Sequence, residues 1–466
     1  QLIDKMMHIQ DKVFKTPTIL LSGAVSGEEE VPDGVLAVLV RSAKEAPDIL
    51  SHCAVRARNS KVVLATCFDP AISAQLAKDF EGKWVEVRTT PDGHLHVEAS
   101  EPSTAGSPTS TGAEAAEADA KVAGGETVRM NLTDDLGCAW CVRPDEMTRE
   151  RVGSKSLNLA LLHPRLPTGV LTPQAVALPY GCMQKALTDP ANESSVLPSL
   201  QKVLGKLQPS TSNEEAQVLF EEAQQLVMRM VMPEDLKGAI REAMAQEGTR
   251  QGEERLKELF DPRDAWVAIK GVWASLFALR PWVSLAKAGR SFHDLNMAVL
   301  VQELVEAKYA FVLHTVNPFT HDKDELYGEL FAGRGEAIVG NYPGRALSFK
   351  VRRGGEVEVI AFPSKSVALH TQHCLIFRSD SNGEDLEGFA GAGLFESICA
   401  QSDAVGFARL HRLPVVTDRG YRQDLLRRIA EVGWATEAAF GGAPQDIEGC
   451  VDVGDRIFIV QSRPQV

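Results

Sequence analysis

The chain has 466 residues, of which 63 are acidic and 49 basic, so its formal net charge is −14 at pH 7. This negative balance argues against a nucleic-acid or anionic-membrane partner. No apolar run reaches the roughly 20 residues that cross a bilayer, and eight cysteines in a chain this long do not make a disulfide scaffold. The length suffices for two or three domains. Because the chain begins with Gln and shows no signal or transit peptide, we expect a fragment of a longer protein.

The first part of the chain predicts a linker helix followed by a compact α/β domain. Residues 1–16 carry apolar side chains at roughly helical spacing, which indicates an amphipathic helix. Over residues 17–98, short β-type runs alternate with turns and short helices. Residues 99–126 are small and acidic, with almost no large apolar side chain, and predict a flexible linker. A merely tolerated insertion is the alternative for this stretch.

The chemistry of the first domain centres on residues 48–59, between β-type runs at 35–40 and 62–66. Ser51 is a good N-cap, which places His52 in the first turn of a short helix, where free backbone N–H groups favour an anion. Arg56 follows one turn later, within reach of a phosphate carried by the imidazole. A neutral imidazole is a competent nucleophile near pH 7. The residues alone are equally compatible with a buried histidine flanked by two solvated arginines.

A second domain is expected over residues 127–466. Small residues and Lys155 precede an apolar helix at 153–159, which is phosphate-loop chemistry without the Walker spacing. Residues 197–280 have helical composition, and β-type runs return at 298–305 and 309–315. The pair Cys138 and Cys141 has no second pair at zinc-finger spacing, so we expect a structural role for it.

Two further stretches in this domain carry phosphate and metal chemistry. In residues 376–393, Arg378 leaves a predicted strand and can hold two phosphate oxygens, while serines and glycine N–H groups can bind the rest. Residues 445–465 predict two strands that present Glu448 and Gln461. A carboxylate and an amide oxygen suit a Mg²⁺ ion that bridges ATP phosphates.

These motifs together resemble the α-glucan, water dikinases, which are related to pyruvate phosphate dikinase and phosphoenolpyruvate synthase. Residues 25–34, 50–59 and 65–69 resemble the family's phosphohistidine domain, and 376–393 resemble its Arg-Ser…Glu-Asp-Leu…Ala-Gly signature. The resemblance implies an α/β and α+β multidomain chain: a swivelling phosphohistidine domain, then an ATP-grasp-like nucleotide-binding domain. It covers nearly the whole chain except the linker.

The resemblance also implies roles for individual residues. His52 is the phosphorylated residue and Arg56 assists it. Metal binding falls to Glu448 and Gln461. Matching motifs assign a set of residues to ATP: Lys155, Lys270, Arg280, Gln302, Glu336, Arg378, Ser379, Glu384, Asp385, Gly391 and Arg463. Residues 298–315 match the family's central β-hairpin, and 445–465 match its nucleotide-site hairpin.

The implied reaction converts ATP, α-glucan and water into AMP, phosphoglucan and orthophosphate, with Mg²⁺ as cofactor. Residues 55–69 look like the subfamily that acts at glucosyl C6 rather than C3. A phosphoenolpyruvate synthase or pyruvate phosphate dikinase is the alternative enzyme, although its nucleotide domain would precede the histidine domain. A non-enzymatic regulatory module would require a degraded ATP site.

The partners implied are starch-like α-glucan and ATP, with no nucleic acid and no membrane span. The resemblance implies a plastid stroma location, with the cytoplasm as the alternative, and a homodimer is kept open as the oligomeric state.

Overall fold

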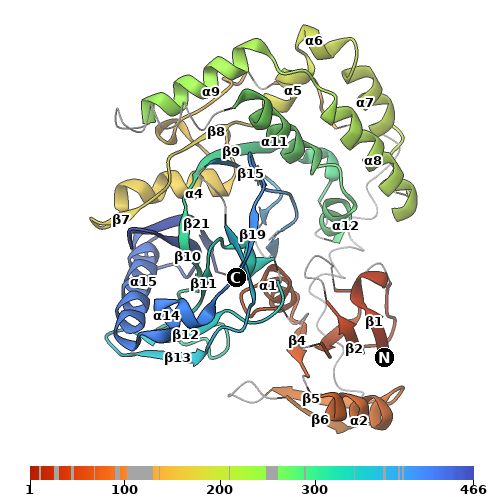
Figure 1. Cartoon of the computed structure of the whole chain (residues 1–466). Helices are drawn as coiled ribbons and strands as arrows, with labels where there is room; N and C mark the ends of the chain where they lie inside the picture. Colours follow the sequence, from red (N-terminus) through yellow and green to blue (C-terminus); the bar gives the residue numbers. More distant parts are fainter. Residues whose placement is uncertain are drawn as a thin grey trace.

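A computed structural model describes residues 1–9, 12–25, 31–42, 47–67, 69–89, 95–101, 130–135, 137–208, 210–247, 261–287, 290–340, 342–370, 374–386, 389–390 and 393–465 (Figure 1). The predicted linker at 99–126 lies outside this part of the chain apart from its first three residues. No helix among the described residues is long and apolar enough to cross a membrane.

The first domain is built on a parallel sheet in the order β1-β2-β3-β4. Its elements are β1 (Leu2–Lys5), η1 (Met6–His8), β2 (Thr18–Ala24), β3 (Val35–Val40), α1 (His52–Asn59), β4 (Val63–Thr66), α2 (Pro70–Phe80), β5 (Val85–Thr89) and β6 (Leu95–Ala99). The predicted linker helix at 1–16 is wrong, because residues 2–5 pair with β2 as a strand. Met6 then packs into the core of this domain with Leu20 and Val38, which a spacing argument cannot distinguish from a helix face.

An antiparallel sheet in the order β18-β15-β9-β8 and a helical layer form the upper part of the second domain (Figure 1). The strands are β8 (Ala175–Leu178), β9 (Met297–Leu304), β15 (Cys374–Ser381) and β18 (Ile398–Cys399). The helices are α5 (Cys182–Leu187), α6 (Pro190–Glu193), α7 (Leu197–Leu204), α8 (Asn213–Met228), α9 (Glu234–Glu247), α11 (Pro262–Ala274) and α12 (Leu279–Lys287). They confirm the helical interpretation of 197–280 for the residues that the structure describes there.

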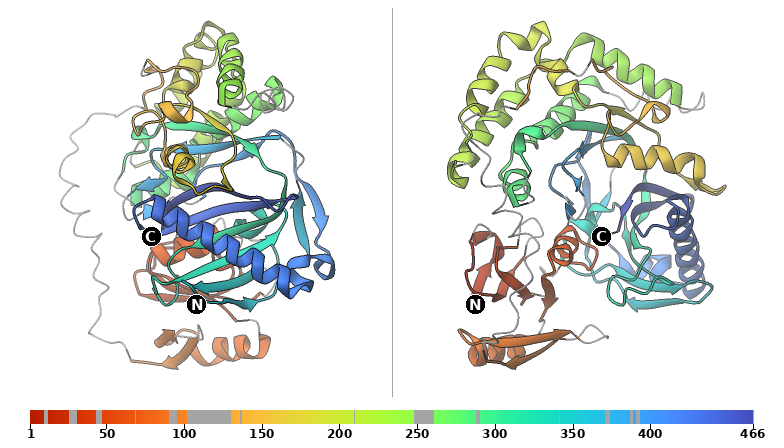
Figure 2. Two further views of the ribbon diagram at one scale, coloured as in Figure 1. Left: turned by 90° about the vertical axis from the view of Figure 1, so that its left-hand side faces the viewer. Right: turned by 180° about the vertical axis from the view of Figure 1, so that it is seen from behind.

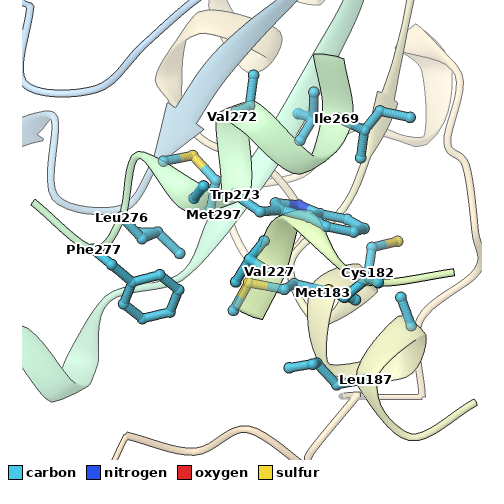
Figure 3. Packing of buried hydrophobic residues seen from close by; sticks show 14 of the residues in the cluster. Cys182, Met183, Leu187, Val227, Ile269, Val272, Trp273, Leu276, Phe277 and Met297 are labelled. Carbon is cyan, nitrogen blue, oxygen red and sulfur yellow. The ribbon is translucent and has the colours of Figure 1, made fainter. Parts of the chain in front are cut away.

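Trp273 of α11 lies at the centre of the core between this sheet and its helices. Figure 3 shows its indole close to Met183, Cys182 and Val227, and all four side chains are buried. Sγ of Cys182 lies 3.8 Å from Sγ of Cys138. Cys138, for which we expect a structural role, therefore packs at this core.

A second sheet of seven strands, in the order β13-β12-β11-β10-β20-β21-β7, forms the lower part of the second domain. Its strands are β7 (Val170–Leu171), β10 (Ala307–His314), β11 (Glu325–Ala332), β12 (Leu347–Arg352), β13 (Val357–Ala361), β20 (Gln445–Asp452) and β21 (Ile457–Pro464). The long helix α15 (Arg419–Ala439) packs against this sheet (Figure 1). The predicted pairing of 445–452 with 457–464 is confirmed.

The predicted hairpin over 298–315 is wrong, although both strands exist. β9 pairs with β8 and β15, whereas β10 pairs with β11 and β20, so the chain passes from one sheet to the other at residues 305–306. Consecutive apolar strands with a short connection favour a hairpin, and only the tertiary partners show otherwise.

The remaining elements connect these layers. They are η2 (Pro144–Glu146), α4 (Ser154–Leu162), η3 (His163–Arg165), η4 (Phe292–Asp294), α13 (Glu336–Val339), β14 (Val367–His370), β16 (Asp385–Leu386), β17 (Phe389–Ala390), β19 (Ala404–Phe407), η5 (Leu410–Arg412) and α14 (Pro414–Thr417). In both views of Figure 2, α1 lies beside the seven-stranded sheet, away from α2 and the β5–β6 hairpin.

Candidate active site

A cavity of about 500 Å³ lies where α1 of the first domain meets both sheets of the second. His52 and Arg56 line it from α1. Gln302 and Arg378 line it from the upper sheet, and Glu448 from the lower sheet. Groups from both domains therefore face one volume, and this volume falls within the ordinary range for a small-molecule site.

His52 is the first residue of α1, as the sequence predicts. Ser51 has extended backbone geometry, and its Oγ accepts a hydrogen bond from the N–H of Ala54 at 3.4 Å. Burial lowers the pKa of His52 to about 4. The negative charge of Glu448 opposes this shift, whereas the positive charges of Arg463 and Arg56 add to it. The imidazole is consequently neutral at pH 7, with a free electron pair for nucleophilic attack.

A loop of the second domain lies directly over His52. A Cβ added to Gly393 would come 3.0 Å from Nδ1 of His52 and 3.3 Å from Nη1 of Arg56. Arg280 of α12 donates to the carbonyl oxygen of Gly393 and also lines the cavity. Arg280 thus lines the cavity, and it also holds this loop in place.

Glu448 and Gln461 face each other across β20 and β21, as directly paired residues. Arg378 of β15 joins them, since its Nη2 donates to Oε2 of Glu448 at 3.1 Å. Burial alone would raise the pKa of Glu448, but Arg378, His52 and Arg463 outweigh it and hold the pKa below its usual range. Nε of Arg378 is buried with no hydrogen-bond partner among the described residues, so the guanidinium retains a donor for an anionic ligand.

Arg463 is held beside this group by Asp446 of β20. Its Nε and Nη2 donate to Oδ2 of Asp446 at 2.9 and 2.7 Å. His314 lies on the other side of that carboxylate, 3.6 Å from Oδ1. Although burial opposes ionisation, Arg463 and His314 hold the pKa of Asp446 well below its usual range. Asp446 fixes the arginine in the cavity wall, and the sequence analysis did not identify it.

Lys155 reaches the cavity, but its surroundings differ from the predicted phosphate loop. Its Nζ donates to Glu384 at 2.6 Å and to Oγ of Ser379 at 3.1 Å. The N-terminus of α4 is occupied by the buried carboxylate of Asp380, which accepts from the N–H groups of Gly153, Lys155 and Ser156 at 3.0, 2.9 and 3.3 Å. This carboxylate takes the place that the sequence suggested for a phosphate.

Glu336 and Gln302 line the cavity from α13 and β9. Burial raises the pKa of Glu336, against the nearby Arg334. Arg334 pairs with Asp403 at 2.5 Å, and both line the same wall without having been predicted. Nε2 of Gln302 donates to the carbonyl oxygen of Val460 at 3.1 Å, which joins the two sheets behind the cavity.

Two predicted ATP residues do not reach the cavity. Nζ of Lys270 donates to the carbonyl oxygens of Met228 and Met230 at 2.7 and 3.3 Å, so it caps the C-terminal end of α8. Ser379 is fully buried behind Lys155. The motif match gave the positions of both residues along the chain but not the side to which they point. Gly391 and the side chain of Asp385 lie outside the described residues.

A bound Mg²⁺ would find oxygen donors in this cavity. Glu448 supplies a carboxylate and Gln461 an amide oxygen, and both line the wall beside Arg378 and Arg463. Among the described residues no cluster of three or more His, Cys, Asp or Glu could hold a metal. A site of two protein oxygens fits Mg²⁺, which keeps several waters and takes its other ligands from phosphates.

The fold and the cavity define a class: a histidine-bearing α/β domain docked on a nucleotide-binding domain. Residues 1–105 match the family of the α-glucan water dikinase phosphohistidine-like domain, and residues 251–344 match the pyruvate phosphate dikinase AMP/ATP-binding domain. Along its whole length the chain is homologous to part of the α-glucan water dikinases.

Three relatives show the extent of this homology. The chloroplastic α-glucan water dikinase of Solanum tuberosum is 39% identical over 467 residues, and that of Citrus reticulata is 39% identical over 476. The α-glucan water dikinase 1 of Arabidopsis thaliana is 36% identical over 472 residues. Each alignment covers 100% of this chain but only 30%, 30% and 32% of the relative, so the chain spans about a third of their length.

Proposed function

We propose that the chain carries the phosphoryl-transfer part of an α-glucan, water dikinase. His52 takes the β-phosphoryl group of ATP while the γ-phosphoryl group passes to water, and phospho-His52 then donates to a glucosyl hydroxyl. The products are AMP, orthophosphate and phosphoglucan. One observation carries the proposal: His52 lies in the same cavity as Arg378, Arg463 and Glu448.

The residues of the cavity support both parts of this chemistry. The neutral imidazole of His52 can attack phosphorus, and Arg56 is placed beside it to neutralise the phosphohistidine. Arg280, Arg378 and Arg463 supply positive charge for a polyphosphate. Glu448 and Gln461 would hold Mg²⁺, which would neutralise phosphate oxygens when bound.

The acceptor and the location rest on resemblance. The relatives are named as glucan water dikinases, and several are named chloroplastic, so we propose starch-like α-glucan as acceptor and the plastid as compartment. We place transfer at glucosyl C6, because residues 55–69 resemble that subfamily. The first domain must then move between ATP and the glucan.

The experiment uses ATP labelled at the β or the γ position, followed by soluble glucan. The proposal expects label on the protein and then on the glucan from the β position, and label in orthophosphate from the γ position. Acid hydrolysis of the product should release glucose 6-phosphate. The proposal would be contradicted if the protein were labelled from the γ position, or if the label on the protein were not transferred to glucan.

A further inference from the structure

Residues 48–50, which directly precede the α1 helix, are buried against the second domain. Leu50 is 2% exposed and belongs to the core of the seven-stranded sheet, together with Phe331 and Leu347. Ile49 packs against the same core, whereas Cys53 and Ala57 of α1 pack into the core of their own domain. We call residues 48–50 the docking segment, because they complete the core of the other domain.

Lys365 of the second domain neutralises the docking segment. Its Nζ lies 2.7 Å from Oδ2 of Asp48, and both side chains are 1% exposed. Its Nζ also donates to two carbonyl oxygens of its own domain, those of Tyr342 and, at 3.2 Å, Gly344. Asp48 also accepts from the N–H of Ala346 at 3.2 Å. Removal of either partner of such a buried pair leaves the charge of the other buried and uncompensated.

Glu329 of β11 binds the backbone of the same segment. Its Oε1 accepts from the N–H of Ile49 at 3.2 Å, and its Oε2 accepts from the N–H of Leu50 at 3.1 Å. Glu329 is 1% exposed, so these two donors take the place of water around its carboxyl group. Nη1 of Arg58 donates to the carbonyl oxygen of Ile49 at 2.8 Å, which ties α1 to the bound segment.

We infer that Glu329 and Lys365 are positioning residues that dock the first domain so that His52 enters the cavity. His52 follows Leu50 by two residues, and the N–H of Ser51 donates to the carbonyl oxygen of Asp48 at 3.1 Å. Fixing the docking segment therefore fixes the start of α1. Neither residue lines the cavity, so their effect on the reaction passes through the position of His52.

This inference rests on the proposed function, and it adds a requirement to it. Gly393 of the cavity wall lies directly against Nδ1 of His52, so we place the meeting of phospho-His52 with a polymeric acceptor outside this arrangement. The docking segment must leave Glu329 and Lys365 before phospho-His52 meets glucan. Docking thus favours phosphorylation by ATP and opposes transfer to glucan.

The test compares Glu329→Gln and Asp48→Asn with wild type in the full chain. Glu325→Gln is the matched control, because Glu325 lies on the same strand and is bonded to Asn317 rather than to the docking segment. Hydrogen exchange of the amides of Ile49 and Leu50 reports docking directly. Rapid-quench labelling from β-labelled ATP at saturating ATP reports the first half-reaction, and chase of preloaded phosphoprotein with glucan reports the second.

We expect both variants to speed exchange at the two amides and to slow labelling of His52 at least about tenfold, because an amide NH2 group cannot accept the hydrogen bond that the replaced oxygen accepts. ATP affinity should stay at the wild-type value, and transfer from preloaded protein should be as fast or faster. Glu325→Gln should match wild type in all readouts. Unchanged exchange and labelling in both variants would overturn the inference. If wild type itself takes no label from ATP, the proposed function fails, while exchange still tests docking.

Discussion

Gly393 of the nucleotide-binding domain lies directly against His52 of the first domain, and a Cβ at this position would come 3.0 Å from Nδ1. Gly393 has a φ of +72°, a backbone conformation that residues with a side chain rarely adopt, and Arg280 donates to its carbonyl oxygen. The absence of a side chain here lets the histidine enter the cavity. The contact joins two residues more than 300 positions apart, and no local pattern reveals it.

Gly393→Ala should therefore impair phosphorylation of His52. The methyl group would meet the imidazole and Arg56 at distances tighter than ordinary contact. We expect labelling from β-labelled ATP to fall at least about tenfold, since about 1.4 kcal/mol of strain in the docked state has that effect. Gly354→Ala is the control, because Gly354 has φ of +68° with no atom within 4 Å of the added Cβ. Equal labelling in the two variants would contradict the steric argument.

His52 should remain a nucleophile in mild acid. Its pKa of about 4 means that the imidazole loses its proton as pH rises through 4 and stays neutral above that value. An ordinary histidine would be half protonated near pH 6.5. An NMR titration should show no protonation of this imidazole between pH 5.5 and 7.5. The His52 resonance is assigned by its absence in His52→Gln, and this variant should also take no label from ATP. A His52 resonance that titrates near 6.5 would contradict this prediction.

Arg378→Ala should separate the two half-reactions. The guanidinium pairs with Glu448 on the nucleotide side of the cavity and retains a buried donor for phosphate. Loss of such a charge-assisted contact removes about 2 kcal/mol or more, so labelling of His52 should fall at least about tenfold. When the variant has been phosphorylated on His52 by long incubation, it should still transfer the phosphoryl group to glucan at the wild-type rate. If transfer fails equally, Arg378 acts in the second half-reaction as well.

Asp380→Ala should lower stability rather than affect chemistry alone. The carboxylate binds three N–H groups at the start of α4 and is fully buried. Removing a buried cap leaves donors unsatisfied and costs about 2 kcal/mol or more. Thermal unfolding should show a clearly lower Tm than for Asp322→Ala, because the Asp322 side chain is partly exposed and pairs with the exposed Arg352. A Tm equal to that of this control would show that water replaces the cap.

The elements that carry the centre of the candidate site could be predicted because their signals are local. Ser51 and His52 follow capping rules, and Glu448 and Gln461 lie at matched positions of a real hairpin. The first strand was predicted as a helix because its apolar residues continue at helical spacing into Met6. Lys270 was assigned to ATP by its place in a motif, yet the carbonyl oxygens of Met228 and Met230 hold it elsewhere.

The residues that sequence reasoning missed are defined by contacts between distant segments. Asp446 acts through Arg463, and Asp380 takes the place predicted for a phosphate at α4. The docking segment was visible only as residues preceding a helix. Its partners Glu329 and Lys365 lie about 280 and 320 residues further along the chain, so neither propensity nor spacing could pair them with it.

Docking of the first domain should weaken as pH rises. Burial, followed by the charge of Asp48, raises the pKa of Glu329 from its ordinary 4.5 to about 8 in the docked arrangement. The charged or titratable groups that face it are Asp48, Tyr327, Arg345 and Arg58. Burial also raises the pKa of Asp48, so both carboxyl groups bind protons more tightly when docked.

The direction of this pH dependence follows from proton linkage. A group with a raised pKa in one state stabilises that state fully below its lower pKa and loses the effect as pH passes through the higher one. Undocking exposes Glu329 to water, where its pKa returns toward 4.5, so the docking equilibrium should fall by up to about tenfold per pH unit between these two values and level off above 8. Amide exchange at Ile49 and Leu50, corrected for intrinsic rates, should therefore rise from pH 6 to 8. In Glu329→Gln the rise should be smaller, because the group with the pKa of about 8 is removed. A wild-type profile that is flat over this range, or one identical to that of Glu329→Gln, would show that Glu329 stays ionised while docked.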